Sequence, residues 1–422
     1  MKGKEVKGNL PEIIVTILFI LTFGSSSEKQ AMAASAPDIK IALVYPLSGA
    51  LSRNGNLTLQ SNKAAINWVN ETGGIKSLGG AKLVAVVADS GSTLEGASSA
   101  MERVCRDPDI IMAMGTWSSS LTMASTEVTE RMGIPQFSSS YADALNGRGF
   151  KYGFYVTTPS SGLTDAGLPK VLDLAKSVGH VVKTSMIVGD KTVSAKVFYD
   201  AAKKIFSSLG IQIISEEGWS MGTLTDATPV MQKVKTLNPD IVMFHASAIS
   251  EAQMCLMKKK ELGIQTPFIS FGGYAADPSF RSVGADALEG LVALTGTFPH
   301  KNTPQEWITR ALDQCKKEYS DEPWVGQDLG MGWGKVPIMA AILEKAATRD
   351  RKTLREVAAM LDLHDVPATR HTLKQGMAFD PNGRLAKKYQ DTLIVQWQGG
   401  VPRAVYPPSL ALAKPHWVFK SK

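Results

Sequence analysis

Short apolar runs alternate with stretches of helical spacing along most of this chain. The first round predicts strands at 39–45, 82–88, 110–114 and 133–137, with helices at 60–71 and 94–106 between them. A second round predicts strands at 184–188, 212–216, 241–244 and 267–271, with helices at 194–209, 227–236 and 252–262. Strands of this kind, separated by helices, are typical of parallel sheets that helices cover on both faces. We therefore expect an α/β protein with two doubly wound parallel-sheet lobes.

Polar residues or glycines follow the predicted strands at seven places. They are Ser48, Ser90, Ser118, Ser139, Asp190, His245 and Gly272. The carboxyl ends of parallel strands meet at one edge of a sheet, and ligands of such folds bind there. The pattern thus predicts a ligand-binding cleft between the two lobes.

The segment 115–120 carries the clearest chemistry, since it reads Gly-Thr-Trp-Ser-Ser-Ser between an apolar strand and a helical stretch. Serine hydroxyls and the free N–H groups of the helix start then share one small volume. Such an arrangement holds a small anion without a charged side chain. Ser119 and Ser120 have an alternative role, in which they only cap the helix.

The N-terminus has the layout of a secretory signal peptide. Lys2, Lys4 and Lys7 precede an apolar core at 13–23, and Ala31-Met32-Ala33 supplies the small residues of a cleavage site. The apolar core is about eleven residues long, whereas a membrane span needs roughly twenty, which favours a cleaved signal over an uncleaved anchor. We expect residues 1–33 to be removed and the mature protein to be periplasmic.

Composition and spacing exclude several classes of function. The net charge of +7 is spread along the chain without a Lys/Arg-rich block, so nucleic acid is not an expected partner. There is no Gly-x-Ser-x-Gly, no His-Glu-x-x-His and no Gly-x-Gly-x-x-Gly after the first strand, so we expect no enzyme activity and no dinucleotide. The histidines show no ligand spacing, and we expect no metal or other cofactor.

The three cysteines do not form a recognised motif. Cys105, Cys255 and Cys315 lie far apart and lack the CxxC spacing of zinc or redox sites. Two arrangements are possible in an exported protein: one disulfide with one free thiol, or three separate buried thiols.

Two blocks at the start of the mature chain carry a family resemblance. Residues 40–49 (Lys-Ile-Ala-Leu-Val-Tyr-Pro-Leu-Ser-Gly) and 66–75 (Ile-Asn-Trp-Val-Asn-Glu-Thr-Gly-Gly-Ile) resemble the periplasmic branched-chain amino acid (Leu/Ile/Val) binding protein family, the type I solute-binding proteins of ABC importers. The resemblance continues through 115–120, 133–140, 263–273 and 379–383 and covers nearly the whole mature chain.

The resemblance implies two lobes that close on a small molecule and present it to an ABC permease in the inner membrane. It implies three crossing segments, which we place near Thr157, Leu294 and Gln390. The expected lobes are 37–157 plus 296–388, and 158–295 plus 389–422. We expect a monomer. A ligand-sensing module for a membrane receptor is the alternative, because the same trap can present its ligand to a receptor.

The resemblance assigns one set of residues to the carboxylate of an amino acid ligand and another set to its ammonium group. Family members that bind amino acids hold the ligand carboxylate with the first serine of the triple serine, which is Ser118 here. They hold the ammonium with the segment after the fourth strand, here Ser139-Ser140-Tyr141-Ala142, and with an acid whose place is taken by Gly272. Two family tyrosines are replaced by Asn54 and Ser194. Asp143 would supply the acid if this loop were one residue shorter.

These departures change the expected ligand. An ammonium buried without a carboxylate costs several kcal/mol, far more than the about 1 kcal/mol that a neutral hydrogen bond returns. We therefore expect a carboxylic acid, and an aromatic one because Trp117 is placed to stack on a flat ring. Aliphatic acids, small amides and branched-chain amino acids remain the alternatives.

The candidate ligand-binding residues combine the triple serine, the segment after the fourth strand and the strand ends of the second lobe. They are Asn54, Trp117, Ser118, Ser119, Ser139, Ser140, Tyr141, Ser194, His245, Gly272 and Tyr274. Trp117 and His245 also have structural interpretations, as a core aromatic and a hydrogen-bonded histidine. Trp333, in a glycine-rich segment, lies either over the cleft mouth or under it.

Overall fold

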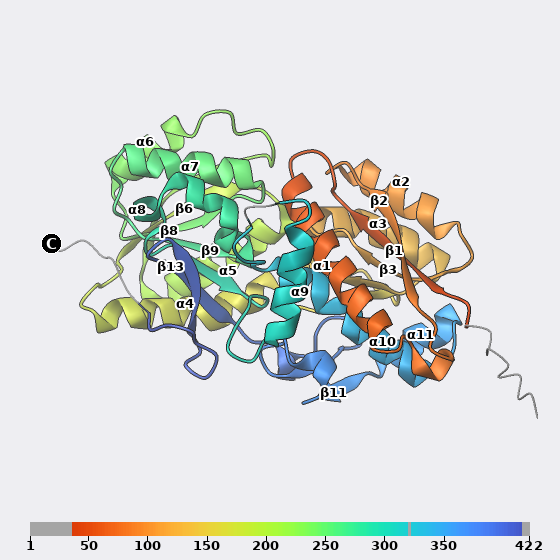
Figure 1. The fold of residues 1–422 in the computed structure, drawn as a ribbon. Helices are drawn as coiled ribbons and strands as arrows, with labels where there is room; N and C mark the ends of the chain where they lie inside the picture. The colour runs from red at the N-terminus through yellow and green to blue at the C-terminus, as the bar shows by residue number, and fades with distance from the viewer. Residues whose placement is uncertain (1–35, 320–321, 416–422) are drawn as a thin grey trace, which may run out of the picture. The chain divides into compact units, whose positions relative to one another are not determined.

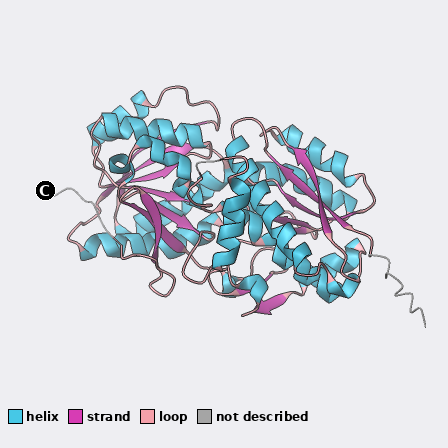
Figure 2. Ribbon diagram, in the orientation of Figure 1, coloured by secondary structure: helices cyan, strands magenta, loops and turns pink. Residues whose placement is uncertain are grey.

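The computed structural model describes residues 36–319 and 322–415, so the predicted signal peptide at 1–33 lies outside the described residues. The strands gather in two main sheets with helices beside them (Figures 1 and 2). Within the described ranges, no helix combines the length and apolar character that crossing a bilayer requires.

The first sheet has five parallel strands in the order β2-β1-β3-β4-β5. They are β1 Ile39–Tyr45, β2 Leu83–Asp89, β3 Ile110–Gly115, β4 Gln136–Ser138 and β5 Gly153–Tyr155, and the connecting helices are α1 Ser52–Glu71, α2 Leu94–Cys105 and α3 Ser119–Met132. Along β1, Ile41 and Leu43 join the core that includes α1, whereas Ala42 and Val44 join the core that includes α2. Both faces of the strand are buried, which explains its unbroken apolar run.

Helix α1 begins eight residues earlier than the sequence pattern predicts, at Ser52 instead of residue 60. Its first turns carry Asn54 and Gly55, which lower helix propensity. A Cβ atom at Gly55 would lie 2.0 Å from the carbonyl oxygen of Pro46. The glycine thus lets the helix pack against the loop after β1, a tertiary contact that local propensity does not encode.

The second sheet has seven strands in the order β14-β13-β10-β9-β8-β6-β7. They are β6 Thr184–Asp190, β7 Gln212–Trp219, β8 Ile241–His245, β9 Phe268–Phe271, β10 Val292–Thr295, β13 Leu393–Gln398 and β14 Val401–Tyr406. Strands β6 to β10 pair in parallel, while β13 and β14 are antiparallel. The predicted doubly wound α/β class is confirmed, and the antiparallel pair is an addition that the sequence pattern missed.

One helix precedes the parallel strands of the second sheet and the others connect them. They are α4 Ser160–Ser177, α5 Val193–Leu209, α6 Thr228–Leu237, α7 Ile249–Glu261 and α8 Ala285–Leu288. Ile187, Met243 and Ile269 share a core with Phe198 of α5.

The remaining elements follow β10 or connect the longer ones. They are η1 Lys76–Leu78, η2 Asp143–Leu145, η3 Gly273–Ala276, η4 Pro278–Val283, α9 Gln305–Cys315, η5 Leu329–Trp333, α10 Lys335–Ala346, α11 Arg351–Ala359, β11 Asp362–His364, η6 Pro367–Thr369, β12 Gly376–Ala378 and η7 Lys387–Tyr389. Strands β11 and β12 form a small antiparallel sheet.

Two of the segments where we expect the chain to cross between lobes are hydrogen-bonded to each other. The Thr158 hydroxyl donates to the Asp391 carbonyl oxygen at 2.9 Å and accepts from the Asp391 N–H at 3.1 Å. Gly296, in the third segment, lies close to the first, because a Cβ atom added to it would lie 2.7 Å from the Thr157 hydroxyl. The three segments therefore lie side by side, while the predicted lobe boundaries stay predictions.

All three cysteines are free and buried, which decides between the two alternatives left open by the sequence. Burial raises the pKa of the Cys105 thiol to about 11 and that of Cys255 to about 12. The thiols act as small apolar core groups.

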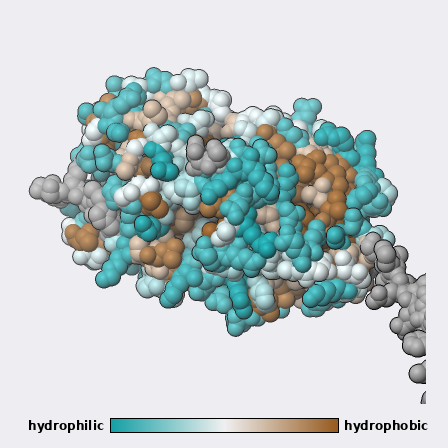
Figure 3. Space-filling view, in the orientation of Figure 1, coloured by the Kyte–Doolittle hydropathy of each residue, from teal (hydrophilic) through white to brown (hydrophobic). Residues whose placement is uncertain are grey.

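Strand β2 forms the edge of the first sheet and carries exposed apolar side chains. Val84 and Val87 are 39% and 38% exposed, and Figure 3 shows an apolar area over this strand. The area lies at a sheet edge and not at the carboxyl ends of the strands, where the ligand-binding cleft is predicted.

Candidate functional site

A small pocket lies at the carboxyl ends of strands from both sheets. It is lined by Trp117, Ser118, Ser119, Tyr141, Ser194, His245, Ser247, Phe271, Gly272, Gln327 and Met331. The volume of the pocket that water can enter is about 30 Å³. A water needs about 10–15 Å³ on this measure, so a larger ligand enters only when the walls separate.

The first wall is the turn between β3 and α3. Ser118 is the N-cap of α3, and its hydroxyl oxygen accepts from the Leu121 N–H at 3.3 Å, which leaves its O–H as a donor. Ser119 is the first residue of the helix, so the capping role considered for it belongs to Ser118. The positive end of the α3 dipole therefore lies at the pocket.

Trp117 has an unusual backbone in this turn. Its φ is +72°, in the left-handed region that bulky residues rarely adopt. The ring is 8% exposed, and the indole Nε1 has no hydrogen-bond partner among the described residues. Strained backbone of this kind gathers at functional sites, and a buried indole N–H facing no acceptor is a donor available to a ligand.

The segment Ser139-Ser140-Tyr141-Ala142, which we call the serine loop, forms the next wall. The backbone N–H groups of Tyr141 and Ala142 donate to the Ser119 hydroxyl oxygen at 3.1 and 3.0 Å. The Tyr141 hydroxyl lies 3.0 Å from the Thr297 hydroxyl and donates to Gln327 Oε1 at 3.3 Å. Ser119 and Tyr141 thus tie the serine loop to the pocket wall.

The second sheet supplies an aromatic wall. The His245 ring stacks on Phe271, with centroids 4.1 Å apart and an interplanar angle of 17°. Tyr141 meets the same Phe271 ring edge-on, at 5.9 Å and 88°. Gly272 follows with φ +77°, a conformation that favours glycine. Ser194, in the first turn of α5, adds a hydroxyl at a second helix N-terminus.

No Asp, Glu, Lys or Arg side chain lines this pocket in the part of the chain that the structure describes. Burial lowers the pKa of His245 to about 4, although Asp190 opposes the shift, so the imidazole is neutral at pH 7. Its Nε2 lies 3.2 Å from the Ser247 hydroxyl. The pocket surface is therefore aromatic and hydroxylic, without formal charge.

Three predicted site residues whose side chains the structure describes do not line the pocket. Asn54 is buried in α1, and Ser139 and Ser140 are buried behind the pocket wall. Ser140 belongs to a hydroxyl cluster, in which its oxygen lies 2.7 Å from both Thr122 Oγ1 and Ser138 Oγ. Tyr274 lies in η3, and its side chain is outside the described part.

The strand-end acids are engaged elsewhere. Asp190 accepts from the Thr192 hydroxyl at 2.7 Å and from the Ser247 N–H at 2.5 Å. Asp143 accepts from the Ser161 hydroxyl at 2.5 Å. Neither acid lines the pocket.

Sequence reasoning missed Ser247, Phe271, Gln327 and Met331. Ser247 and Phe271 flank strand ends that the sequence pattern predicts, so a wider window around those ends includes them. Gln327 and Met331 belong to the glycine-rich segment around η5. Trp333 of this segment is fully buried and stacks on Trp307 with centroids 5.5 Å apart, so it packs in the core and does not lie over the cleft mouth.

Comparisons with known proteins agree with this architecture. The profile of the periplasmic binding protein family matches residues 38–400. Leu/Ile/Val-binding protein homolog 8 from Brucella suis is 25% identical over 409 residues, which cover 94% of this chain and 98% of that protein.

Two solved structures illustrate the shared fold. The substrate-binding protein LivJ of the branched-chain amino acid transporter from Streptococcus pneumoniae, in complex with isoleucine, aligns with a TM-score of 0.71 at 18% identity and covers 90% of this chain and 100% of its own. An ABC-transporter solute-binding protein from Rhodopseudomonas palustris, in complex with benzoate, aligns with a TM-score of 0.71 at 17% identity, covering 91% and 99%.

Two α/β sheets with a pocket at their strand ends define a small-molecule-binding protein of the type I periplasmic binding fold. The chain belongs to the periplasmic binding protein family. It is thus a solute-binding protein of the ABC-transporter type, a class of extracytoplasmic transport components that are not enzymes. The predicted family is confirmed.

Proposed function

We propose that this protein captures a small aromatic carboxylate outside the cytoplasm and delivers it to an ABC permease in the inner membrane. The observation that carries the proposal is the pocket lining, which offers rings, hydroxyls and helix N-termini but no acidic side chain among the described residues. The proposal includes export by a signal peptide at 1–33 and function as a monomer.

The argument against an α-amino acid rests on its ammonium group. A buried ammonium needs a carboxylate partner, because its desolvation otherwise costs several kcal/mol. Gly272 stands where the resemblance implies an acid. The nearby acids Asp190 and Asp143 already accept hydrogen bonds from Thr192, Ser247 and Ser161.

The argument for an aromatic acid rests on two matched features. Trp117, Tyr141, His245 and Phe271 surround the pocket with π faces and edges, which favour offset or edge-on packing of another ring. Ser118 and the α3 N-terminus suit a carboxylate. The solved neighbours include benzoate and isoleucine complexes at the same TM-score, so the pocket chemistry carries the choice.

The mechanism that we propose is capture by closure. The lobes, 37–157 plus 296–388 and 158–295 plus 389–422, separate to admit the ligand and then close on it. The ligand favours the closed form because it contacts Ser118 on one side and Ser194 and His245 on the other only when both sides meet. The permease then recognises the closed form.

A calorimetric titration of the purified, exported protein tests the ligand class. Benzoate should bind with a saturable heat, whereas leucine should give none, because the site lacks an ammonium partner. Phenylalanine serves as a control that carries both the ring and the ammonium. Tight binding of leucine without a response to benzoate would overturn the proposal.

Replacing Ser118 by alanine should weaken binding of the carboxylate by about 1–3 kcal/mol, because a hydrogen bond to a charged oxygen is lost. Since Ser118 also caps α3, the matched control is Thr93→Ala, which removes the cap of α2 away from the pocket. Both variants should lose similar stability, and only Ser118→Ala should lose affinity. Unchanged affinity in Ser118→Ala would remove this residue from the site.

A further inference from the structure

Two buried cations lie directly behind the serine loop. Lys335, the first residue of α10, is 2% exposed, and its ammonium donates to the Ser139 hydroxyl at 3.4 Å. Arg384 is 3% exposed and donates to the carbonyl oxygens of Ser140 and Ala142, each at 2.7 Å. The serine loop connects both cations to the pocket, because its Tyr141 lines the pocket and donates its N–H to the Ser119 hydroxyl, which lines the pocket as well.

Neither cation has a carboxylate partner within 4 Å among residues 36–319 and 322–415. Arg384 Nε also donates to Asn146 Oδ1 at 2.7 Å, and the guanidinium lies 4.8 Å from the Tyr155 ring centroid. Asp143 and Asp380 act on Arg384 electrostatically without forming an ion pair with it. Two buried cations without a salt bridge are costly unless an anion comes near.

The titratable groups around Lys335 form no ion pair with it among the described residues, although Asp328 acts on it electrostatically. Those that act on it or on its neighbours are Asp328, His371, His300 and the cluster of Arg53, Asp277 and Glu322. Burial raises the pKa of Asp328 well above its usual range, which favours its neutral form, and lowers the pKa of His371 to about 3, so this imidazole is neutral near pH 7. Burial also lowers the pKa of His300.

We infer that Lys335, together with Arg384, balances the charge of the bound carboxylate from behind the serine loop and so makes the site select anions over neutral isosteres. This inference rests on the proposed function. The ligand touches hydroxyls, N–H groups and rings, while the charge that favours an anion acts through one layer of protein, where water screens it little. Lys335 thus acts on the bound ligand through its charge and does not touch it.

A proton should accompany the ligand. Burial lowers the pKa of Lys335 to about 7, against the smaller opposing effect of Asp328. An anion in the pocket favours the charged ammonium and raises this pKa, so binding near pH 7 takes up protons. Affinity is then highest below pH 7 and falls as Lys335 loses its proton. His245, with a pKa of about 4, does not contribute in this range.

The experiment compares benzoate with neutral benzamide by calorimetry, in buffers of different ionisation enthalpy. Wild-type affinity for benzoate should fall about tenfold between about pH 6.5 and pH 8.5, with proton uptake near pH 7, while benzamide stays flat. Lys335→Met should lose about tenfold in benzoate affinity at the lower pH and lose the pH dependence, and should keep its benzamide affinity within about twofold.

The matched control is Lys259→Met. Lys259 is a second buried lysine, with a pKa that burial lowers to about 8, but it lines a separate cavity of about 230 Å³ at the amino-terminal ends of β9 and β10. This variant should keep the wild-type affinity and pH profile.

The outcomes separate the two proposals. Wild-type protein that binds benzoate without proton uptake, or a Lys335→Met variant that keeps both affinity and pH slope, would overturn the inference and leave the proposed function standing. Wild-type protein that binds leucine and ignores benzoate would overturn the proposed function and this inference with it. The proton-uptake measurement needs no variant and holds even if Lys335→Met does not fold.

Discussion

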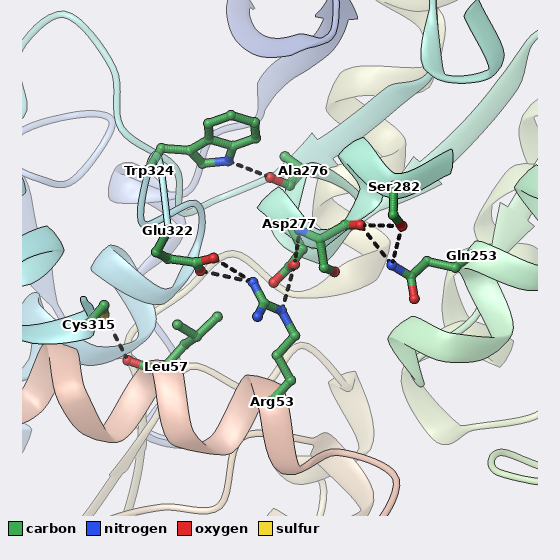
Figure 4. Close-up of polar contacts among 10 residues, drawn as sticks. Arg53, Leu57, Gln253, Ala276, Asp277, Ser282, Cys315, Glu322 and Trp324 are labelled. Carbon is green, nitrogen blue, oxygen red and sulfur yellow. Dashed lines mark hydrogen bonds and ion pairs between the residues drawn. The ribbon is translucent and has the colours of Figure 1, made fainter. Parts of the chain in front are cut away.

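Arg53→Met should lower the free energy of unfolding by about 3 kcal/mol, because it leaves buried carboxylates without their cation. Arg53 extends from α1 between two acids (Figure 4). Its Nε lies 2.8 Å from Asp277 Oδ1, and its Nη2 lies 2.8 and 2.9 Å from the two Glu322 oxygens. Both acids are buried, while the arginine is 24% exposed, which places the expected loss at the lower end of the range for buried pairs.

A surface arginine with the same number of partners is the control. Arg310 pairs with Glu71 at 2.6 Å and with Glu306 at 3.0 Å, but all three side chains are exposed. Urea unfolding of Arg310→Met should show a loss below about 1 kcal/mol. If the two variants lost equal stability, burial of Asp277 and Glu322 would not be the reason that Arg53 matters.

Gly115→Ala should cost about 3 kcal/mol of stability and abolish ligand binding, because the added methyl group has no space. Gly115 ends β3 and pairs with Val44 of β1. A Cβ atom there would lie 2.3 Å from the Val44 carbonyl oxygen, which is backbone and cannot rotate away. Relief requires the two central strands to separate just before Trp117 and Ser118, so the pocket is distorted as well.

Gly147→Ala is the matched control, because a Cβ atom at Gly147 meets nothing within 4 Å. Thermal unfolding and the benzoate titration should show this variant close to wild type. A Gly115→Ala protein with wild-type melting temperature and affinity would contradict the close approach of β1 and β3.

The sequence predicted the framework of the fold correctly because its signals are local. Strand β1 was predicted with its observed ends, since an apolar run buried on both faces is visible in seven residues. The turn into α3 was likewise visible as a glycine followed by serines, although the N-cap is Ser118 and not Ser119 or Ser120. Local rules failed at the start of α1, where Gly55 lowers helix propensity but lets the helix pack against the loop after β1.

The pocket lining likewise contains residues that the sequence predicted and residues that it missed. Strand ends predicted Ser118, His245 and Gly272, and the segment 115–120 predicted Trp117 and Ser119. Tyr141 and Ser194 were predicted from the family resemblance. Gln327 and Met331 were missed because they come from the glycine-rich segment around η5, which only tertiary packing brings to the pocket. Ser139 and Ser140 stand at the right place in the chain but turn behind the wall, where Lys335 and the hydroxyl cluster hold them.

The sequence by itself determined the α/β framework, the family, the serines at the end of β3 and the glycine at position 272. These follow from residue spacing within short windows. The tertiary structure decided which of the polar strand ends face the pocket, that all three thiols are buried, and that two cations stand behind the serine loop. Lys335 and Arg384 reach that loop across 196 and 244 residues of chain. Contacts over such separations depend on how the whole core packs, and no short window of sequence contains that information.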